Sequence, residues 1–122
     1  MRNMSFPLTT EQLLAGIKRV TRRTGWLTLK RGDLIQPVKK CMGLKPGEHI
    51  EPLRAPLRII SVRRELLCRM TDDVSYGISE CALEGFGEHP TLCKPSEFID
   101  FFCKTHKCTP ADFVTRIEFD YT

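Results

Sequence analysis

Residues 16–26 read Gly-Ile-Lys-Arg-Val-Thr-Arg-Arg-Thr-Gly-Trp, which gathers four cations, two hydroxyl groups and an indole around one expected helix end. Clustered cations of this kind create a positive field that attracts phosphate. Lys18 and Thr21 are three positions apart, and they share a face if a helix runs through both. The stretch therefore predicts an anion-binding site, with proton transfer between Lys18 and Thr21 as an additional use.

The residues before this stretch predict an amphipathic helix that begins at Thr10. Thr9 is a suitable N-cap, and Gln12 completes a capping box with it. Lys18 lies among apolar positions that face the core, so we expect it to point elsewhere and to be at least partly exposed. These apolar positions recur at helical spacing, at Leu13, Leu14, Ile17 and Val20.

The chain is expected to become extended near Thr21, because β-branched residues are poor helix formers. In a strand, Thr21 and Arg23 share one side and Arg22 points to the other. Trp26 either stacks on a nucleic-acid base or packs against the protein. Packing is the favoured interpretation for a lone tryptophan.

Turn residues and apolar alternation divide the remaining sequence into short elements. Strands are expected at 33–38 and 57–63, with Pro37 indicating an edge strand or a bulge. A long loop is expected at 39–51, and a helix interrupted by Gly77 between 71 and 85.

A second helix is expected to begin at Pro95, and a strand at 113–121 ends the chain. The phenylalanines of this helix, Phe98, Phe101 and Phe102, recur at helical spacing and are expected in the core rather than around a ligand. Inward positions of the strand are Ile117, Phe119 and Tyr121. The whole predicts one α+β domain over residues 1–122: a small antiparallel β-barrel with flanking helices.

The charge of the chain is divided unevenly between its halves. Residues 1–50 hold ten Lys or Arg and three acids, whereas residues 51–122 hold nine and twelve. Such a basic patch favours RNA or another nucleic acid as a partner, and the alternative is a solvated basic face without a ligand. No stretch has the length or hydropathy of a membrane span or a signal peptide, so we expect a cytoplasmic protein, favoured to be a monomer.

Six cysteines lie in the chain, and we expect them to be reduced thiols because no secretory signal precedes them. A zinc site is the alternative to their packing as small apolar side chains. Irregular gaps and the absence of a CxxC pair argue against the zinc site, whose candidate ligands are His89, Cys93, Cys103, His106 and Cys108. We therefore predict no metal and no other cofactor.

The pattern Gly16-x-Lys18-x-x-Thr21-x-Arg23 after an opening helix, with Glu84-Gly85-Phe86 downstream and an aromatic-rich last strand, resembles the ASCH family. That family is related to the PUA-like barrels, and the resemblance extends from about Phe6 to Tyr121. It implies a barrel with a basic cleft for RNA or nucleotides. Small bacterial members hydrolyse an acylated cytidine nucleoside with a Lys, a Thr and a Glu, and another member is described as a ribonuclease.

Two functions follow from the resemblance. The preferred one is a module that binds RNA or a nucleotide, and the unusually basic cleft mouth favours a polymer over a free nucleoside. Its expected nucleic-acid contacts are Lys18, Arg19, Arg22, Arg23, Trp26, Lys39 and Lys40.

The alternative is a small metal-independent hydrolase with Lys18, Thr21 and Glu84 as catalytic residues. Neighbouring arginines would lower the pKa of Lys18, so that it accepts a proton from the nucleophile Thr21. Glu84 would then orient Lys18 or pass a proton to the leaving amine. In a purely structural alternative, Glu84 only pairs with Lys18 or Arg23, and the Thr21 hydroxyl only satisfies the backbone.

Overall fold

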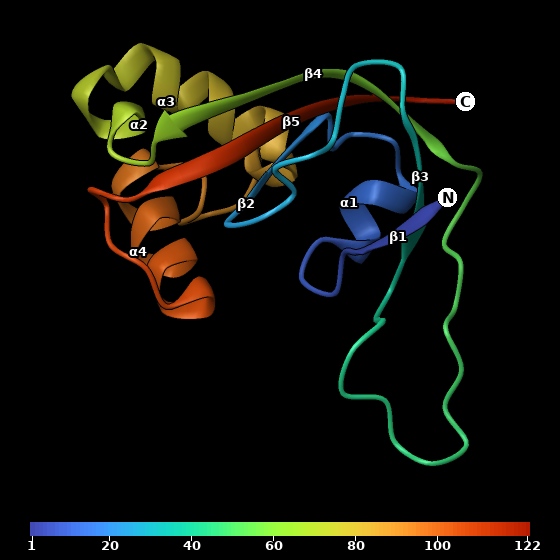
Figure 1. Ribbon diagram of the computed structural model, residues 1–122. Coiled ribbons are helices and arrows are strands. Elements are labelled where there is room, and N and C mark those ends of the chain that lie inside the picture. Colours follow the sequence, from blue (N-terminus) through green and yellow to red (C-terminus); the bar gives the residue numbers. More distant parts are fainter.

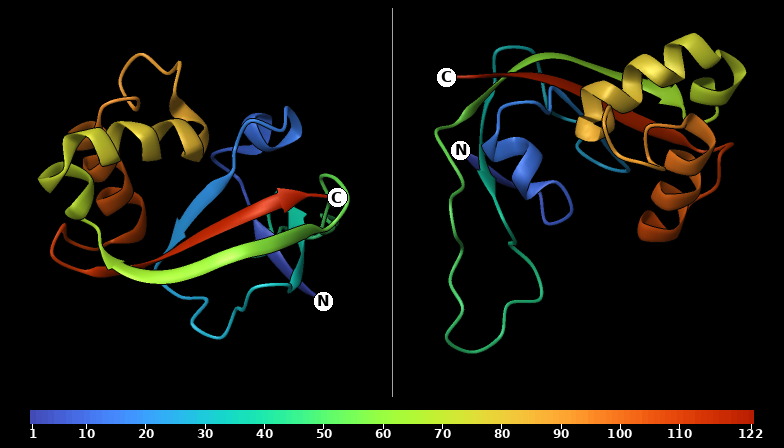
Figure 2. Two further views of the ribbon diagram at one scale, coloured as in Figure 1. Left: turned by 90° about the horizontal axis from the view of Figure 1, so that it is seen from above. Right: turned by 180° about the vertical axis from the view of Figure 1, so that it is seen from behind.

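Two long strands, β4 (Leu57–Leu66) and β5 (Phe113–Tyr121), form the centre of the sheet in this computed structural model, which describes residues 1–122. Their alternating apolar residues pair along almost their full lengths. The other elements are β1 (Arg2–Ser5), α1 (Thr10–Leu14), β2 (Val20–Arg23), β3 (Leu34–Val38), α2 (Arg69–Asp72), α3 (Val74–Cys81), η1 (Ala82–Phe86) and α4 (Pro95–His106). Shorter strands complete the sheet, and α2, α3 and α4 gather at one end of it, whereas α1 lies apart from them beside β1 and β3 (Figures 1 and 2).

The strand order is β1-β3-β4-β5-β2, so β1 and β2 are the two edges. β1 runs parallel to β3, and the other pairings are antiparallel. The predicted α+β class is confirmed, but the sheet is not closed and the predicted barrel is not confirmed. A side chain spans the opening between the edges, since Arg23 on β2 donates a 2.7 Å hydrogen bond to the Ser5 carbonyl on β1.

Helix α1 begins at Thr10 as predicted but ends much earlier than the apolar spacing indicated. Gly16 follows it with a φ of +74°, a left-handed conformation that glycine adopts without strain and that ends a helix. Consequently Leu14 and Ile17 are more than half exposed. Their predicted place in the core is wrong because no helix continues to carry them inward.

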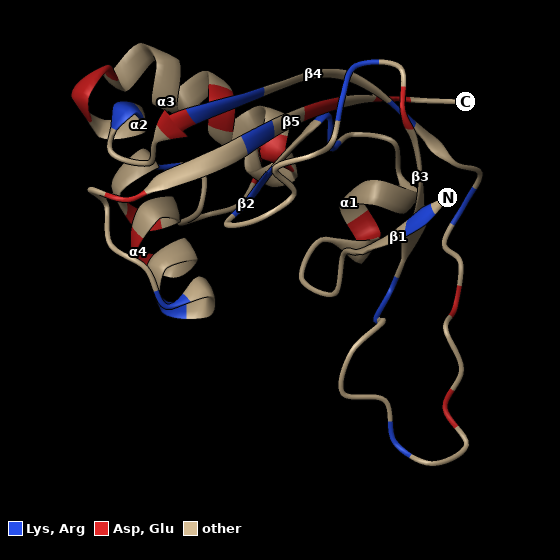
Figure 3. Cartoon of the chain, in the orientation of Figure 1, with Lys and Arg blue, Asp and Glu red and all other residues tan.

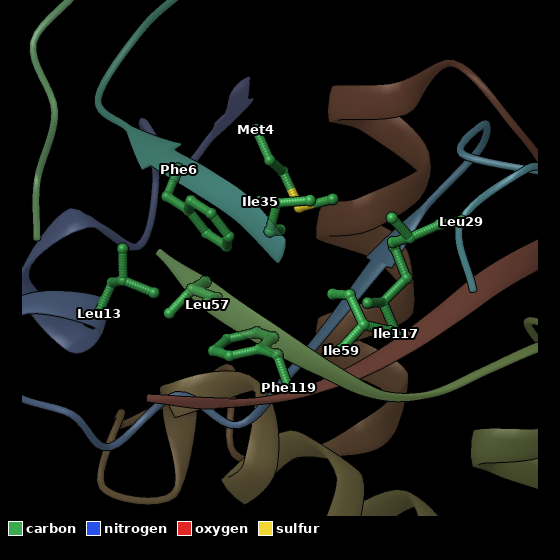
Figure 4. Packing of buried hydrophobic residues seen from close by; sticks show 9 residues of the cluster. All are labelled: Met4, Phe6, Leu13, Leu29, Ile35, Leu57, Ile59, Ile117 and Phe119. Atoms are coloured by element: carbon green, nitrogen blue, oxygen red, sulfur yellow. The ribbon is translucent and has the colours of Figure 1, made fainter. Parts of the chain in front are cut away.

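Two apolar clusters form the core. The first lies in the curve of the sheet (Figure 4) and consists of Met4, Phe6, Leu13, Leu29, Ile35, Leu57, Ile59, Ile117 and Phe119. The second joins the helices to the start of β5 and consists of Leu67, Met70, Cys81, Phe86, Phe98, Ile99, Phe102 and Val114. Strand β5 contributes to both, which agrees with its predicted inward positions Ile117 and Phe119.

The helix predicted between residues 71 and 85 is three successive elements. Asp73 separates α2 from α3 and caps α3 by accepting a hydrogen bond from the Tyr76 amide. The π-helical turn η1 contains Gly85 with a φ of +104°. By contrast, α4 begins at Pro95 as predicted.

No helix of the protein combines the length and the apolar character needed to cross a bilayer.

Residues 39–56 form an extended loop that projects away from the helices (Figures 1 and 2). It follows β3, an interior strand, so the expectation that Pro37 marks an edge is wrong. The proline is tolerated because β4 pairs only with Leu34 and Ile35, and on that side Pro37 only accepts, through its carbonyl, a 3.0 Å hydrogen bond from the Leu53 amide of the loop.

Candidate functional site

A cavity of about 250 Å³ opens where the two sheet edges face the helices. Its lining comes from the segment after β1, from β2, from η1 and from α4, elements that are far apart in the sequence. Polar lining residues include all four positions of the predicted site, Lys18, Thr21, Arg23 and Glu84. The structure therefore brings together the residues that the sequence pattern singled out.

Lys18 and Glu84 form a buried ion pair at this cavity. Lys18 Nζ donates to Glu84 Oε1 at 2.9 Å and to the Glu84 backbone oxygen at 2.8 Å. Only 2% of the Lys18 side chain and 5% of the Glu84 side chain are exposed. The predicted exposure of Lys18 is wrong, because α1 ends before residue 18 and the chain then passes beneath η1.

The close approach of η1 to this segment depends on Gly85. A Cβ at Gly85 would lie 2.9 Å from the side chain of Gln12 and 3.6 Å from Lys18 Cβ. The Arg19 amide also donates to the Leu83 carbonyl at 2.7 Å. The glycine of the Glu-Gly-Phe tripeptide thus lets the backbone of η1 reach the Lys18 segment.

Burial lowers the pKa of Lys18 below its usual value, although the Glu84 carboxylate acts in the opposite direction. Arg23 and Arg22 lower it further, as predicted, but by less than burial does. Arg19 is turned toward Asp120 and solvent, with a 2.9 Å ion pair between exposed side chains. The lowered pKa is therefore mainly an effect of desolvation rather than of the arginine cluster.

Arg22 is enclosed by carboxylates and has no exposed side-chain surface. Its guanidinium pairs with Glu84 at 3.1 Å, with Glu65 at 3.4 Å and with Glu80. Although burial opposes its charged form, these ion pairs raise the pKa of Arg22. Its expected contact with nucleic acid stays a prediction: Arg22 borders the cavity, but its side chain has no exposed surface and holds Glu84 in place.

Thr21 and Arg23 share a side of β2, as the strand geometry predicted. Arg23 Nε donates to Thr21 Oγ1 at 3.1 Å, and its guanidinium lies 4.8 Å from the centre of the Phe6 ring. Burial lowers the pKa of Arg23 to about 10, which leaves it a cation at neutral pH. No hydrogen bond joins Lys18 Nζ to Thr21 Oγ1, so one N–H of the lysine and the threonine hydroxyl hydrogen have no protein partner.

The other predicted nucleic-acid contacts lie outside the cavity lining. Trp26 packs against the first core cluster with Arg2 4.6 Å above its ring. Lys39 and Lys40 begin the long loop, and Lys40 is 4.0 Å from Glu48. Figure 3 shows basic and acidic residues interspersed along that loop, so its surface is of mixed charge rather than positive throughout.

The cysteines and histidines of the second half do not gather around a metal position. No group of three or more His, Cys, Asp or Glu side chains is arranged to hold an ion. All six cysteines are free thiols.

An aromatic wall forms the apolar part of the cavity, and the sequence pattern assigned it to the core alone. Phe98 and Phe102 are buried in the second cluster and also line the cavity with Phe86 and Phe101. The stack continues to His106, whose ring centre is 3.9 Å from that of Phe102. The spacing of 98, 102 and 106 on one helix face was the available signal for this wall.

Comparison with solved structures identifies the fold. An ASCH domain from Lactobacillus crispatus superposes with a TM-score of 0.60 at 17% identity, covering 98% of this chain and 77% of that chain. A protein from Enterococcus faecalis, assigned to the DUF984 family model, superposes with a TM-score of 0.59 at 14% identity and the same coverages. Neither the protein-family models nor the curated proteins matched the sequence. The chain therefore has an ASCH-like fold.

Proposed function

We propose that this protein binds one nucleotide unit, either free or exposed in single-stranded RNA, in the Lys18 cavity. The observation that carries the proposal is the composition of the cavity, which joins an aromatic wall to buried cationic donors. A nucleotide suits both features of the cavity. Its planar base can stack on the aromatic side chains, and its carbonyl and phosphate oxygens can accept hydrogen bonds from the cationic donors.

The size and polarity of the cavity favour a single unit. Its volume of about 250 Å³ lies just below the range of roughly 300 to 1,000 Å³ that is usual for drug-sized ligands. Arg23 and the remaining N–H of Lys18 present donors to an acceptor oxygen. Since both terminal nitrogens of Arg22 are paired with carboxylates and the long loop is of mixed charge, the surface is less basic than the sequence indicated. A long polymer is less favoured as the ligand for the same reason.

Titration calorimetry with nucleosides, nucleoside monophosphates and a short single-stranded oligoribonucleotide tests this proposal. We expect the Lys18→Met variant to weaken binding by tenfold or more, because a charge-assisted hydrogen bond contributes about 1.5–3 kcal/mol. Lys30→Met removes the same charge from an exposed position outside the cavity and should leave the affinity nearly unchanged.

The salt dependence of the same titrations separates the two ligand classes. A polymer that contacts several phosphates loses affinity steeply as salt rises, with a slope of about −0.7 per phosphate for a single strand. A shallow slope with equal affinity for the monomer supports the single unit. Equal binding of the oligoribonucleotide by wild type and Lys18→Met would show that RNA binds elsewhere.

The second candidate is hydrolysis of an N-acylated nucleoside, favoured because the cavity is lined both by a buried lysine with a lowered pKa and by Thr21, whose hydroxyl hydrogen has no protein partner. In this reaction neutral Lys18 accepts the proton of Thr21, whose oxygen attacks the amide carbonyl. The leaving amine takes this proton from Lys18, and water then hydrolyses the acyl ester, which releases the acid and restores the Thr21 hydroxyl. Arg23 is the cavity donor suited to the developing oxyanion.

Thr21→Val is expected to abolish turnover of N-acetylcytidine while retaining affinity, because it removes the hydroxyl and keeps the shape. Turnover by the wild type should rise with pH, since the neutral form of Lys18 is the base. The lowered pKa of Lys18 places this rise below 10.5, its ordinary value. Product release measured by chromatography from pH 5 to pH 10 checks both expectations. Undiminished turnover by Thr21→Val would eliminate this mechanism.

A further inference from the structure

Two thiols meet at the carboxyl end of α4, beside the cavity. Cys103 Sγ and Cys108 Sγ are 4.0 Å apart, and both residues are partly exposed. The backbone already joins them, because the Cys103 carbonyl accepts hydrogen bonds from the amides of Lys107 and Cys108. Lys107 adopts a left-handed φ of +52° to make this turn.

We propose that Cys103 and Cys108 are a site of reversible oxidation, at which a peroxide converts the two thiols to a disulfide that fixes the end of α4. A disulfide needs its sulfur atoms at about 2.0 Å, and 4.0 Å is a separation that side-chain rotation can close. The ring spans residues 103–108, whose ends the hydrogen bonds already hold close together, so the two sulfur atoms can meet without a large backbone displacement.

The reaction consumes one peroxide for each disulfide. The Cys108 thiolate attacks one peroxide oxygen, the O–O bond breaks, and the released hydroxide is protonated to water, leaving a sulfenic acid. The Cys103 sulfur then attacks Cys108 Sγ and displaces its oxygen, which leaves as a second water with the Cys103 proton. Burial and the neighbouring Cys108 thiol raise the pKa of Cys103 to about 11, and the same two steps with the roles of the sulfur atoms exchanged give the same disulfide.

The position of this pair couples it to the cavity. Thr105 and His106 lie inside the ring of the disulfide, and both line the cavity. Closing the ring restricts the motion of the turn that carries them. A ligand that binds the oxidised protein therefore loses less conformational entropy in ordering these two side chains. This coupling rests on the proposed function, and it predicts tighter nucleotide binding, by about fivefold, in the oxidised protein.

Peptide mapping by mass spectrometry, with the full chain treated with one equivalent of hydrogen peroxide, tests the site itself. We expect a Cys103–Cys108 linkage with the loss of two hydrogen atoms, reversed by dithiothreitol. Cys103→Ser and Cys108→Ser should each prevent it, and Cys68→Ser, another partly exposed thiol, should not. Absence of the linkage, or equal linkage among other cysteines, would overturn the proposal.

Calorimetry with a nucleoside monophosphate on reduced and oxidised protein tests the coupling separately. Equal affinity of the two forms would overturn the coupling while the proposed function stands. Failure of the reduced and oxidised forms alike to bind any nucleotide would contradict the proposed function. The mapped disulfide would then still support an oxidation site, without a nucleotide response.

Discussion

Replacement of Arg22 by methionine is expected to lower the free energy of unfolding by about 3–5 kcal/mol, because breaking a buried ion pair leaves its partner charges uncompensated. Three carboxylates, those of Glu65, Glu80 and Glu84, point at this one guanidinium. Each of the remaining cations contacts only one of the three: Lys18 pairs with Glu84, Arg116 with Glu80, and the partly exposed Arg63 and Arg69 with Glu65. The midpoint of urea denaturation measures the loss.

Arg19→Met is the matched control, since it removes the same charge three positions earlier from a pair in which both side chains are about half exposed. Exposed ion pairs contribute about 0–1 kcal/mol to stability, so the free energy of unfolding of Arg19→Met should be lower than that of the wild type by no more than this amount. Adding Glu80→Gln to Arg22→Met should recover part of the loss, because one uncompensated charge is removed. If Arg22→Met is no less stable than Arg19→Met, then the buried carboxylates do not depend on Arg22.

The sequence predicted those elements in which local pattern and tertiary packing agree. Strand 113–121 alternates regularly, and Pro95 fixes the first turn of α4, so both are confirmed. The meeting of Lys18 and Glu84 was predicted only through the spacing of the Gly16 motif and the Glu-Gly-Phe tripeptide. Residues 66 positions apart carry no local signal of their contact.

Most of the wrong predictions concerned the first helix: where it ends, and where the side chains that follow it point. Apolar spacing continued the first helix to Val20, whereas Gly16 ends it and turns Lys18 inward. A charge run also cannot reveal that three acids on later elements enclose Arg22, one of its members. The predicted core position is confirmed for Phe98 and Phe102, but helical spacing does not reveal that the same face borders a cavity.

Gly77→Ala is expected to destabilise the protein by about 3 kcal/mol or more, because overpacking at a rigid backbone contact cannot be relieved by rotating a side chain. A Cβ at Gly77 would lie 1.9 Å from the Met70 carbonyl oxygen and 2.7 Å from Pro95 Cγ. To accept it, α3 must move away from α2 and from the start of α4. Thermal denaturation followed by circular dichroism measures the effect.

Gly25→Ala provides the control, because nothing lies within 4 Å of the added Cβ and its stability should change little. The Gly77 substitution also reaches the cavity, since α3 continues directly into η1, which carries Glu84. Displacement of η1 would lengthen the contact between Lys18 and Glu84 and weaken nucleotide binding in whatever fraction of Gly77→Ala remains folded. A folded Gly77→Ala protein with wild-type stability would show that α2 and α3 can separate without cost, which would contradict this prediction.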